Sequence, residues 1–264
     1  MSVSRRTLLK TAAAAAFAPP VLSAARASDG FIELIAGPAK AQLLAGGQPQ
    51  TEVWAYGGGV PGPVLRARQG EPFRLRFINR LPQPSTIHWH GIRIANAMDG
   101  VAGLTQDAVP PGESFDYVFT PPDAGTYWYH PHSRTWEQLA RGLYGALIVE
   151  EQLAPGFDAD IPLLLDDWRL TKEGAIHEAS LGGMMDFSHA GRLGNWVTVN
   201  GTSLPSLELP AGGLARLRLI NTSNARVLDL KLGDFSGHII AYDGQPIDPV
   251  TIPASPVALA PAQR

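Results

Sequence analysis

The chain has 264 residues, enough for one or two ordinary domains, with 21 basic and 24 acidic residues and a formal net charge of −3. A slightly acidic chain lacks the electrostatic footprint of a protein that binds nucleic acid or anionic lipid, so we expect neither partner. The sequence contains no cysteine, which excludes disulfides and any metal site that depends on a thiolate ligand.

Residues 1–27 predict an export signal. Arg5 and Arg6 open it, an alanine-rich run follows, and Ala25-Arg26-Ala27 matches a signal-peptidase site. We expect export by the twin-arginine pathway, cleavage after Ala27 and a periplasmic or secreted product. The alternative is a loose alanine-rich helix. Once this signal is set aside, no stretch is long and apolar enough to span a bilayer, so no membrane span is expected.

Short apolar runs separated by frequent Gly (28) and Pro (23) predict an all-β sandwich or barrel, since no helical period is sustained. Residues 73–79 alternate apolar and basic side chains, which is typical of a half-buried strand with its arginines outward. Residues 114–120 and 145–150 are predicted to be further strands. The only helix expected is a short one near residues 136–141.

Two short stretches, Thr-Ile-His-Trp-His-Gly and Tyr-Trp-Tyr-His-Pro-His, carry paired histidines: His88 with His90, and His130 with His132. Alternate side chains of a strand share a face, so the two members of a pair point the same way, about 7 Å apart at their Cα atoms. Two such strands side by side would bring four imidazoles together, and neutral imidazole binds copper, zinc or iron. A single pair would fit ordinary strand residues, but two pairs favour a metal site.

These motifs resemble the first two copper motifs of the multicopper oxidases, the laccase-like enzymes. The resemblance covers nearly all of the chain after residue 30 and continues through Met98-Asp99-Gly100, Leu104-Thr105-Gln106, residues 110–113 and residues 142–145. It implies cupredoxin-like Greek-key β-sandwich domains. It also implies an enzyme that oxidises phenolic, amine or metal-ion substrates and reduces dioxygen to water at a trinuclear copper cluster. The two later copper motifs of the family are absent from this sequence.

Carried over residue by residue, the resemblance implies that His88 binds the type 2 copper of the cluster. The type 3 copper pair would take His90, His130 and His132. Asp99 resembles the acid that relays protons to the cluster, although Asp-Gly is equally typical of a simple turn. The type 1 blue-copper ligands are absent, because that site needs a cysteine thiolate.

The family's cluster needs eight histidines, so this chain would supply half of the ligands and be inactive alone. The implied partners are dioxygen, a small reducing substrate and a missing C-terminal cupredoxin domain. Forming a homo-oligomer would not replace that domain, because two-domain laccases carry all four copper motifs in each subunit.

An internal repeat divides the chain. Residues 63–79 align with residues 205–221 without a gap, including their Pro, Gly and Arg-Leu-Arg positions, and the alignment pairs Gly59 with Gly201. The repeat predicts a first domain at residues 28–150, a linker at 151–160 and a second domain at 161–264, opened by a strand at 161–166. Residues 109–114 resemble residues 259–264, so the first domain is complete and the second is predicted to be incomplete.

The remaining polar residues carry weaker signals. Glu137 follows the second histidine pair and could hydrogen-bond a ligand, but a solvated helix position is favoured. The aromatic residues that flank the ligands are interpreted as core, the two methionines after Gly183 as packing, and the solitary histidines as structural: Trp89, Tyr127, Trp128, Tyr129; Met184, Met185; His177, His189, His238.

Three functional hypotheses follow. The first is a copper-binding N-terminal part of an exported multicopper oxidase. The alternative is a periplasmic copper-binding or sequestering protein without turnover, which would use the same histidines. The third is a non-enzymatic scaffold of the same fold that lost its copper ligands, and the intact histidine pairs argue against it.

Overall fold

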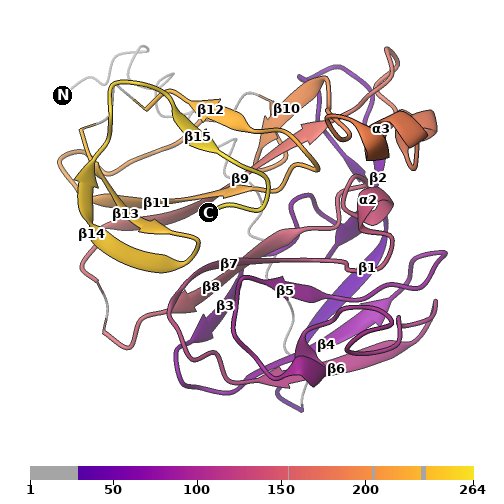
Figure 1. Ribbon diagram of the computed structural model, residues 1–264, viewed down its shortest axis with the longest axis horizontal. Helices are drawn as coiled ribbons and strands as arrows, with labels where there is room; N and C mark the ends of the chain where they lie inside the picture. Colours follow the sequence, from indigo (N-terminus) through magenta and orange to yellow (C-terminus); the bar gives the residue numbers. More distant parts are fainter. Residues whose placement is uncertain (1–28, 154, 204–205, 233–235) are drawn as a thin grey trace, which may run out of the picture.

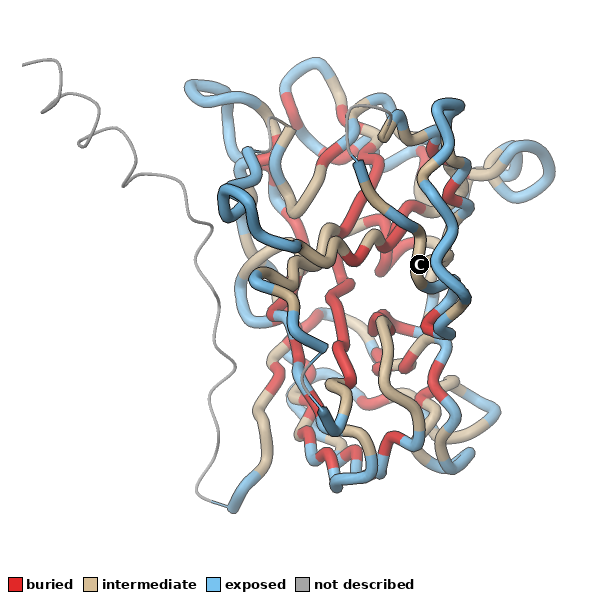
Figure 2. The backbone as a smooth tube through the Cα atoms, turned by 90° about the vertical axis from the view of Figure 1, so that its left-hand side faces the viewer, coloured by how far each residue is buried: buried red, intermediate tan, exposed pale blue. Residues whose placement is uncertain are grey.

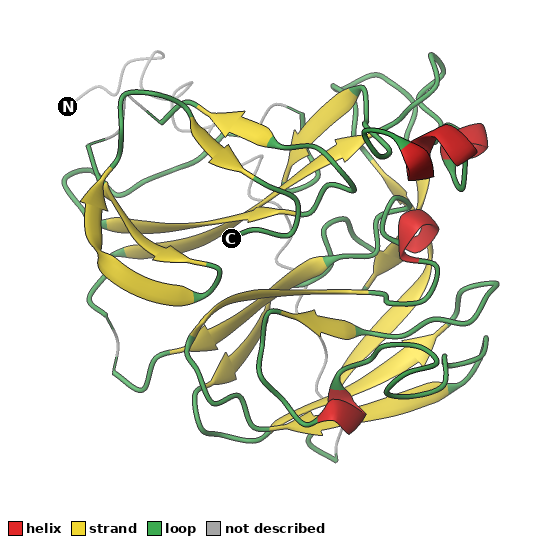
Figure 3. Ribbon diagram, viewed as in Figure 1, coloured by secondary structure: helices red, strands yellow, loops and turns green. Residues whose placement is uncertain are grey.

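The computed structural model describes residues 29–153, 155–203, 206–232 and 236–264, so the predicted signal at residues 1–27 lies outside the described residues. Strands dominate and the helices are short (Figure 3), which confirms the predicted all-β class. The first half of the chain lies below the second in Figure 1. Exposed loops surround a buried interior (Figure 2). No helix among these residues is long and apolar enough to cross a membrane.

The first half is a sandwich of two four-stranded sheets. One sheet has the order β2-β1-β4-β6, with bounds Thr51–Tyr56, Ile32–Ala41, Phe73–Asn79 and Ser114–Phe119. The other has the order β3-β8-β7-β5, with bounds Leu65–Arg68, Gly145–Glu150, Gly125–His130 and His88–His90. The strands predicted at residues 73–79, 114–120 and 145–150 are therefore confirmed.

Alternation along β4 and β5 builds the core between these sheets. Phe73, Leu75 and Phe77 point inward from β4, while the arginines between them lie on the outer face. Trp89 points inward from β5, and its ring meets that of Phe73 edge to face at 5.6 Å between centroids. Because Trp89 is buried in this core, the histidines on either side of it are turned to the opposite face of the sheet.

The second half has a three-stranded sheet, β10-β9-β11, and two two-stranded sheets, β12-β15 and β13-β14. The strand predicted at residues 161–166 is confirmed as part of β9, which begins earlier, inside the predicted linker. The incompleteness of the second domain stays a prediction. The domain boundaries themselves stay a prediction. The strand bounds are β9 Ala159–Trp168, β10 Trp196–Val199, β11 Ala215–Asn221, β12 Leu228–Leu230, β13 His238–Tyr242, β14 Gln245–Thr251 and β15 Val257–Leu259.

The two halves repeat the same strand pairing. β1 pairs antiparallel with β2 and parallel with β4, and β9 pairs in the same way with β10 and β11. Each copy ends its parallel strand at a buried asparagine. The Asn79 side-chain amide donates to the carbonyl of Val109, and that of Asn221 donates to the carbonyl of Leu259. Each asparagine therefore joins the end of its strand to the second pair of similar segments, residues 109–114 in the first copy and 259–264 in the second.

The alignment of Gly59 with Gly201 is wrong by one residue. Positive φ occurs at Gly57 and Gly58 in the first copy and at Asn200 and Gly201 in the second. These pairs form the two central positions of tight turns closed by the bridges of residues 56 with 59 and 199 with 202. Gly58 is therefore the counterpart of Gly201, because both positions need a left-handed backbone.

The helical content exceeds the single short helix expected. The predicted helix near residues 136–141 is present as α2, Thr135–Gln138. A second helix, α3, covers Met184–Ser188, and two short 3-10 helices, η1 and η2, cover Asn96–Met98 and Glu178–Ser180. The sequence does not indicate α3, because glycines flank it and because five residues are too few to show a helical period.

A buried cluster joins the halves. Trp128 and Tyr144 of the first half belong to it together with Leu164, Trp168 and Ile220 of the second. Hydrogen bonds cross at its edge, from the Thr51 hydroxyl to the carbonyl of residue 174 and from the Trp196 indole to that of residue 43. The back of the β7–β8 sheet is therefore covered by the second half rather than by solvent.

Candidate metal centre

The paired histidines lie on neighbouring strands. β5 pairs antiparallel with β7 in a register that sets His88 opposite His130 and His90 opposite Trp128. Trp89 and Tyr129, which lie between these positions, are fully buried in the sandwich core. Because side chains alternate across a strand, the burial of these two aromatic residues fixes the face on which the histidines stand.

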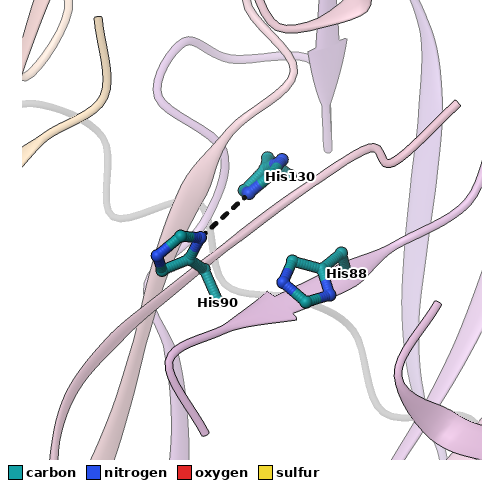
Figure 4. A group of neighbouring side chains, drawn as sticks. All are labelled: His88, His90 and His130. Atoms are coloured by element: carbon teal, nitrogen blue, oxygen red, sulfur yellow. Dashed lines mark hydrogen bonds between the residues drawn. The ribbon is translucent and has the colours of Figure 1, made fainter. Parts of the chain in front are cut away.

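Three of the histidines converge closely enough to share a metal. The candidate ligand atoms of His88, His90 and His130 all lie within 4.8 Å of one another. His130 Nε2 faces His90 Nδ1 (Figure 4), and the two atoms are 3.4 Å apart. Metal–imidazole bonds of about 2.0 Å at a tetrahedral angle separate two ligand nitrogens by about 3.3 Å. The His90 and His130 nitrogens therefore have the spacing that two ligands of one metal ion require, and a set of imidazole nitrogens fits copper.

His132 takes a different position from its three companions. It lies just beyond the end of β7 and is exposed. Its ring centroid is 5.1 Å from that of His88 and 6.2 Å from that of His130. Its backbone N–H donates to the Thr86 hydroxyl, which ties the two motifs together. The structure thus brings the predicted fourth histidine beside the group of three but not into it.

Backbone carbonyls set the tautomers of two histidines. His88 Nδ1 lies 2.8 Å from the carbonyl oxygen of Asp99, and His130 Nδ1 lies 3.0 Å from that of Pro131. A carbonyl accepts only, so each Nδ1 must carry the proton and donate. The Nε2 atoms then keep their lone pairs. This is the usual way in which a ligand histidine is oriented by its other nitrogen.

Burial keeps these imidazoles neutral. It lowers the pKa of His130 well below its usual value, and it also lowers the pKa of His88, where the Asp99 carbonyl and carboxylate oppose it. Burial, the Arg264 charge and His88 together lower the pKa of His90 to about 4. Metal binding needs neutral imidazole, so these three rings are ready to bind at neutral pH.

Asp99 lies beside His88 and also forms a turn. Its carboxylate Oδ1 is 3.4 Å from His88 Nδ1, and its side chain is 30% exposed. The next residue, Gly100, has φ +77°, and a Cβ there would collide with the carbonyl oxygen of Ile87. The turn is therefore present, and it places the Asp99 carboxylate beside His88.

The second half of the chain borders the site through Arg264. Its side chain is only 4% exposed, and its Nε donates to the carbonyl of Thr126 on β7 at 3.1 Å. The guanidinium packs directly on Gly91, which follows His90 and has φ +87°. A Cβ at Gly91 would overlap the guanidinium, so glycine at this position makes the contact possible.

Sequence reasoning misplaced one residue and overlooked others. Glu137 is neither a solvated helix residue nor a ligand partner, because it is buried and pairs with Arg134 and Arg141. The backbone carbonyl of Asp99 and the Arg264 contact had no sequence signal. The flanking aromatic residues are buried as predicted. The solitary histidines, all exposed, lie outside the cluster: His177, His189 and His238.

Comparisons with known proteins agree on one family. A family model described as "Multicopper oxidase" matches residues 39–154. The multicopper oxidase MmcO of Mycobacterium tuberculosis is 31% identical over 84% of this chain and 49% of its own length. Copper resistance protein A of Escherichia coli is 30% identical over 77% of this chain and 40% of its own. The chain thus spans about half the length of the curated relatives it matches.

Solved structures give the same result. A multi-copper oxidase from Pseudomonas thermotolerans superposes with a TM-score of 0.83 at 44% identity, over 88% of this chain and 55% of that one. A blue copper oxidase from Nitrosomonas europaea gives 0.73 at 28% identity, over 88% of this chain and 72% of that one.

Proposed function

Because the chain belongs to the multicopper oxidase family, whose cofactor is copper, we propose that its paired histidines form half of the ligand set of an oxidase copper cluster. The predicted cupredoxin-like class is confirmed together with the family. The other half of the ligands and the blue-copper site would come from a further cupredoxin domain. The complete oxidase would oxidise phenolic, amine or metal-ion substrates and reduce dioxygen to water.

The ligand roles proposed for the histidines follow the resemblance to the family's copper motifs. His88 would hold the type 2 copper, while His90, His130 and His132 would serve the type 3 pair. The position of His132 outside the group of three supports a division of the ligands among several ions rather than a single four-coordinate ion. Bound copper would supply the one-electron chemistry that dioxygen reduction needs.

Asp99 is proposed to pass protons toward the site. Its carboxylate is partly exposed and lies beside His88, so it faces both solvent and the cluster. Reduction of dioxygen to water consumes protons, and a carboxylate in such a place can supply them as a general acid. We also propose that the chain works in the periplasm or outside the cell after export by the twin-arginine pathway, on the strength of residues 1–27.

The observation that carries this proposal is the 3.4 Å contact between His90 Nδ1 and His130 Nε2. It is tested by loading the chain with Cu²⁺ and recording electron paramagnetic resonance and visible spectra. We expect bound copper with nitrogen hyperfine structure, no intense blue band and no phenol oxidation, because no thiolate is present. Failure to bind copper would overturn the proposal, and so would an intense blue band.

The alternative is a copper-sequestering protein without turnover, and the same histidines would serve it. Complementation separates the two functions. Addition of a separately produced cupredoxin domain with the family's later copper motifs should restore phenol oxidation if the chain is part of an oxidase. Tight copper binding that persists while no such domain restores activity would favour sequestration.

A further inference from the structure

Trp128 lies directly beneath two of the candidate ligands. On β7 it stands two residues before His130 and on the same face, and across the strands it is paired with His90. Its ring centroid is 4.2 Å from that of His130, at an interplanar angle of 30°. The corresponding values for His90 are 5.1 Å and 33°. One indole therefore stacks on both imidazoles.

The stacking is selective for these two rings. His90 and His130 are themselves within 39° of parallel. His88, in contrast, stands edge-on, at 83° to His90 and 72° to His130. The indole thus defines a common orientation for the two histidines whose nitrogens face each other, while His88 is held by the carbonyl of Asp99.

His90 depends on this packing more than its partners do. His88 and His130 each have one ring nitrogen bonded to a backbone carbonyl. Among the described residues, no backbone carbonyl is bonded to a ring nitrogen of His90, whose one ring-nitrogen contact is with His130 Nε2. Rotation of a histidine ring about its last torsion is broad and roughly two-fold. A flat surface against the ring is then what selects its plane.

The second half of the chain supports the indole of Trp128 from behind. The Trp128 side chain is buried, and its Nε1–H has no hydrogen-bond partner among the described residues. On its other contacts the indole belongs to the cluster with Tyr144, Leu164 and Trp168, so it is held in place from behind by both halves of the chain.

We propose that Trp128 is a positioning residue of the copper site. Its indole fixes the ring planes of His90 and His130 and thereby aims Nδ1 of one and Nε2 of the other at a shared position. This inference rests on the proposed function, because it assumes that the two histidines bind copper. The described part of the second half supplies no ligand to the group of three, but it supports the platform on which two ligands rest.

Trp89 provides a matched control for the test. It is paired with Tyr129 one step along the same two strands, is fully buried, and likewise has an unpartnered indole N–H. It points into the sandwich core instead of toward the histidines. Trp89→Leu should therefore cost stability as Trp128→Leu does, without changing the copper site.

The experiment compares Trp128→Leu, Trp128→Phe and Trp89→Leu with the parent chain. We would measure Cu²⁺ affinity by calorimetric titration, the nitrogen hyperfine pattern by electron paramagnetic resonance, and folding by circular dichroism. Loss of a ligand-orienting partner typically weakens metal affinity by about 10- to 100-fold. We expect a loss of this size for Trp128→Leu with an altered hyperfine pattern, a smaller loss for Trp128→Phe, and parent-like copper binding for Trp89→Leu.

Each result bears on one claim. Any folded Trp128 variant with the affinity and spectrum of the parent overturns the platform, and the phenylalanine variant serves this purpose even if the leucine variant does not fold. A Trp89→Leu variant that loses copper as strongly as Trp128→Leu would also overturn it, because the effect would then be general destabilisation. If the parent chain itself binds no copper, the proposed function fails and the inference fails with it.

Discussion

Gly100 occupies a backbone position next to the first histidine that an ordinary residue cannot take. Its φ is +77°, and an added Cβ would run into the Ile87 carbonyl. Gly103 has a similar φ of +75° but open space around its Cβ. The two glycines therefore separate the cost of a left-handed backbone from the cost of a collision.

Gly100→Ala should destabilise the protein by about 3 kcal/mol or more, since strain and overlap add. Gly103→Ala should cost about 1 kcal/mol from strain alone. Urea unfolding of both variants measures the difference. If both variants lose the same free energy of unfolding, the turn can move away from the carbonyl of residue 87. In that case the turn does not fix the contact of Asp99 with His88.

Asp99 reaches His88 with its backbone as well as its side chain, and substitution separates the two. Asp99→Asn leaves the carbonyl in place, so copper affinity should fall by less than about tenfold, the lower limit for loss of a ligand-orienting partner. In the complemented oxidase, turnover should fall by about 100-fold if the carboxylate passes protons. A larger loss of affinity would assign the orienting role to the carboxylate, and unchanged turnover would remove the proton role.

At this scale the sequence predicted the residue types better than their contacts. Spacing of two along a strand places His88 with His90 on one face, and the same rule applied to Trp128 and His130 would have found the indole beneath them. The backbone carbonyl of Asp99 determines that His88 carries its proton on Nδ1. Arg264, which borders the site, is distant from the histidines in sequence. No local pattern carries either contact.

Two buried asparagines hold equivalent elements in the two halves. The Asn79 side chain donates to the carbonyls of residues 83 and 109, and its oxygen accepts from the N–H of residue 81. The Asn221 side chain makes the same set with residues 226, 259 and 223. Each asparagine thus fastens the end of a parallel strand, β4 or β11, to its neighbouring loops.

Asn79→Ala and Asn221→Ala should each destabilise the protein by about 2–4 kcal/mol, because each leaves buried carbonyls unpaired. Asn96→Ala, on the exposed 3-10 helix, should stay within about 0.5 kcal/mol of the parent. Chemical unfolding provides the measurement. A negligible effect at one of the two buried sites would mean that the two halves share their strand pairing but do not both depend on the asparagine hydrogen bonds.

The elements were predictable where alternation was long. Residues 73–77 alternate apolar and basic side chains over five positions and lie in the predicted strand, whereas β5 has only three residues and is indicated by its histidines. The one-residue error at Gly59 has a simple cause. A gapless alignment cannot allow for the one-residue shift between the turns at residues 56–59 and 199–202. Helix α3 was missed since five residues hold little more than one turn of a helix.

A network of charges joins the halves close to the histidine strand. Asp160 accepts hydrogen bonds from Arg216 and Arg218, and Arg218 also donates to the Thr126 hydroxyl on β7. Burial raises the pKa of Asp160, but the two arginines outweigh it and lower the pKa to about 2. A carboxyl with a depressed folded pKa stabilises the protein above its unfolded pKa and loses that contribution as pH falls through the folded value.

Asp160→Asn should therefore cost about 2 kcal/mol at pH 7, as the pKa difference implies. The cost should shrink as pH falls from about 4 to about 2. Thermal unfolding across this range measures it, with Glu52→Gln as a control, since Glu52 is exposed and pairs loosely with Lys40 at 3.9 Å. A cost that is independent of pH would mean that the asparagine disturbs packing and not charge.

For the whole molecule, the sequence indicated two copies of one β domain but not how they meet. The cluster that contains Trp128 and Trp168 is built from residues far apart in sequence, so no local sequence motif could predict it. It matters for the site because the platform beneath His90 and His130 is buried against it. The paired histidines lie on or beside β5 and β7 in the first half of the chain, and the second half adds support from behind.

The most direct test is calorimetric titration of Cu²⁺ into the chain at pH 7, where the pKa of about 4 keeps His90 neutral. Alanine at each paired histidine is compared with alanine at each solitary one. We predict a loss of affinity of tenfold or more for the paired set and parent-like binding for the solitary set: His88, His90, His130, His132; His177, His189, His238. Parent-like binding by all four paired-histidine variants would contradict the account.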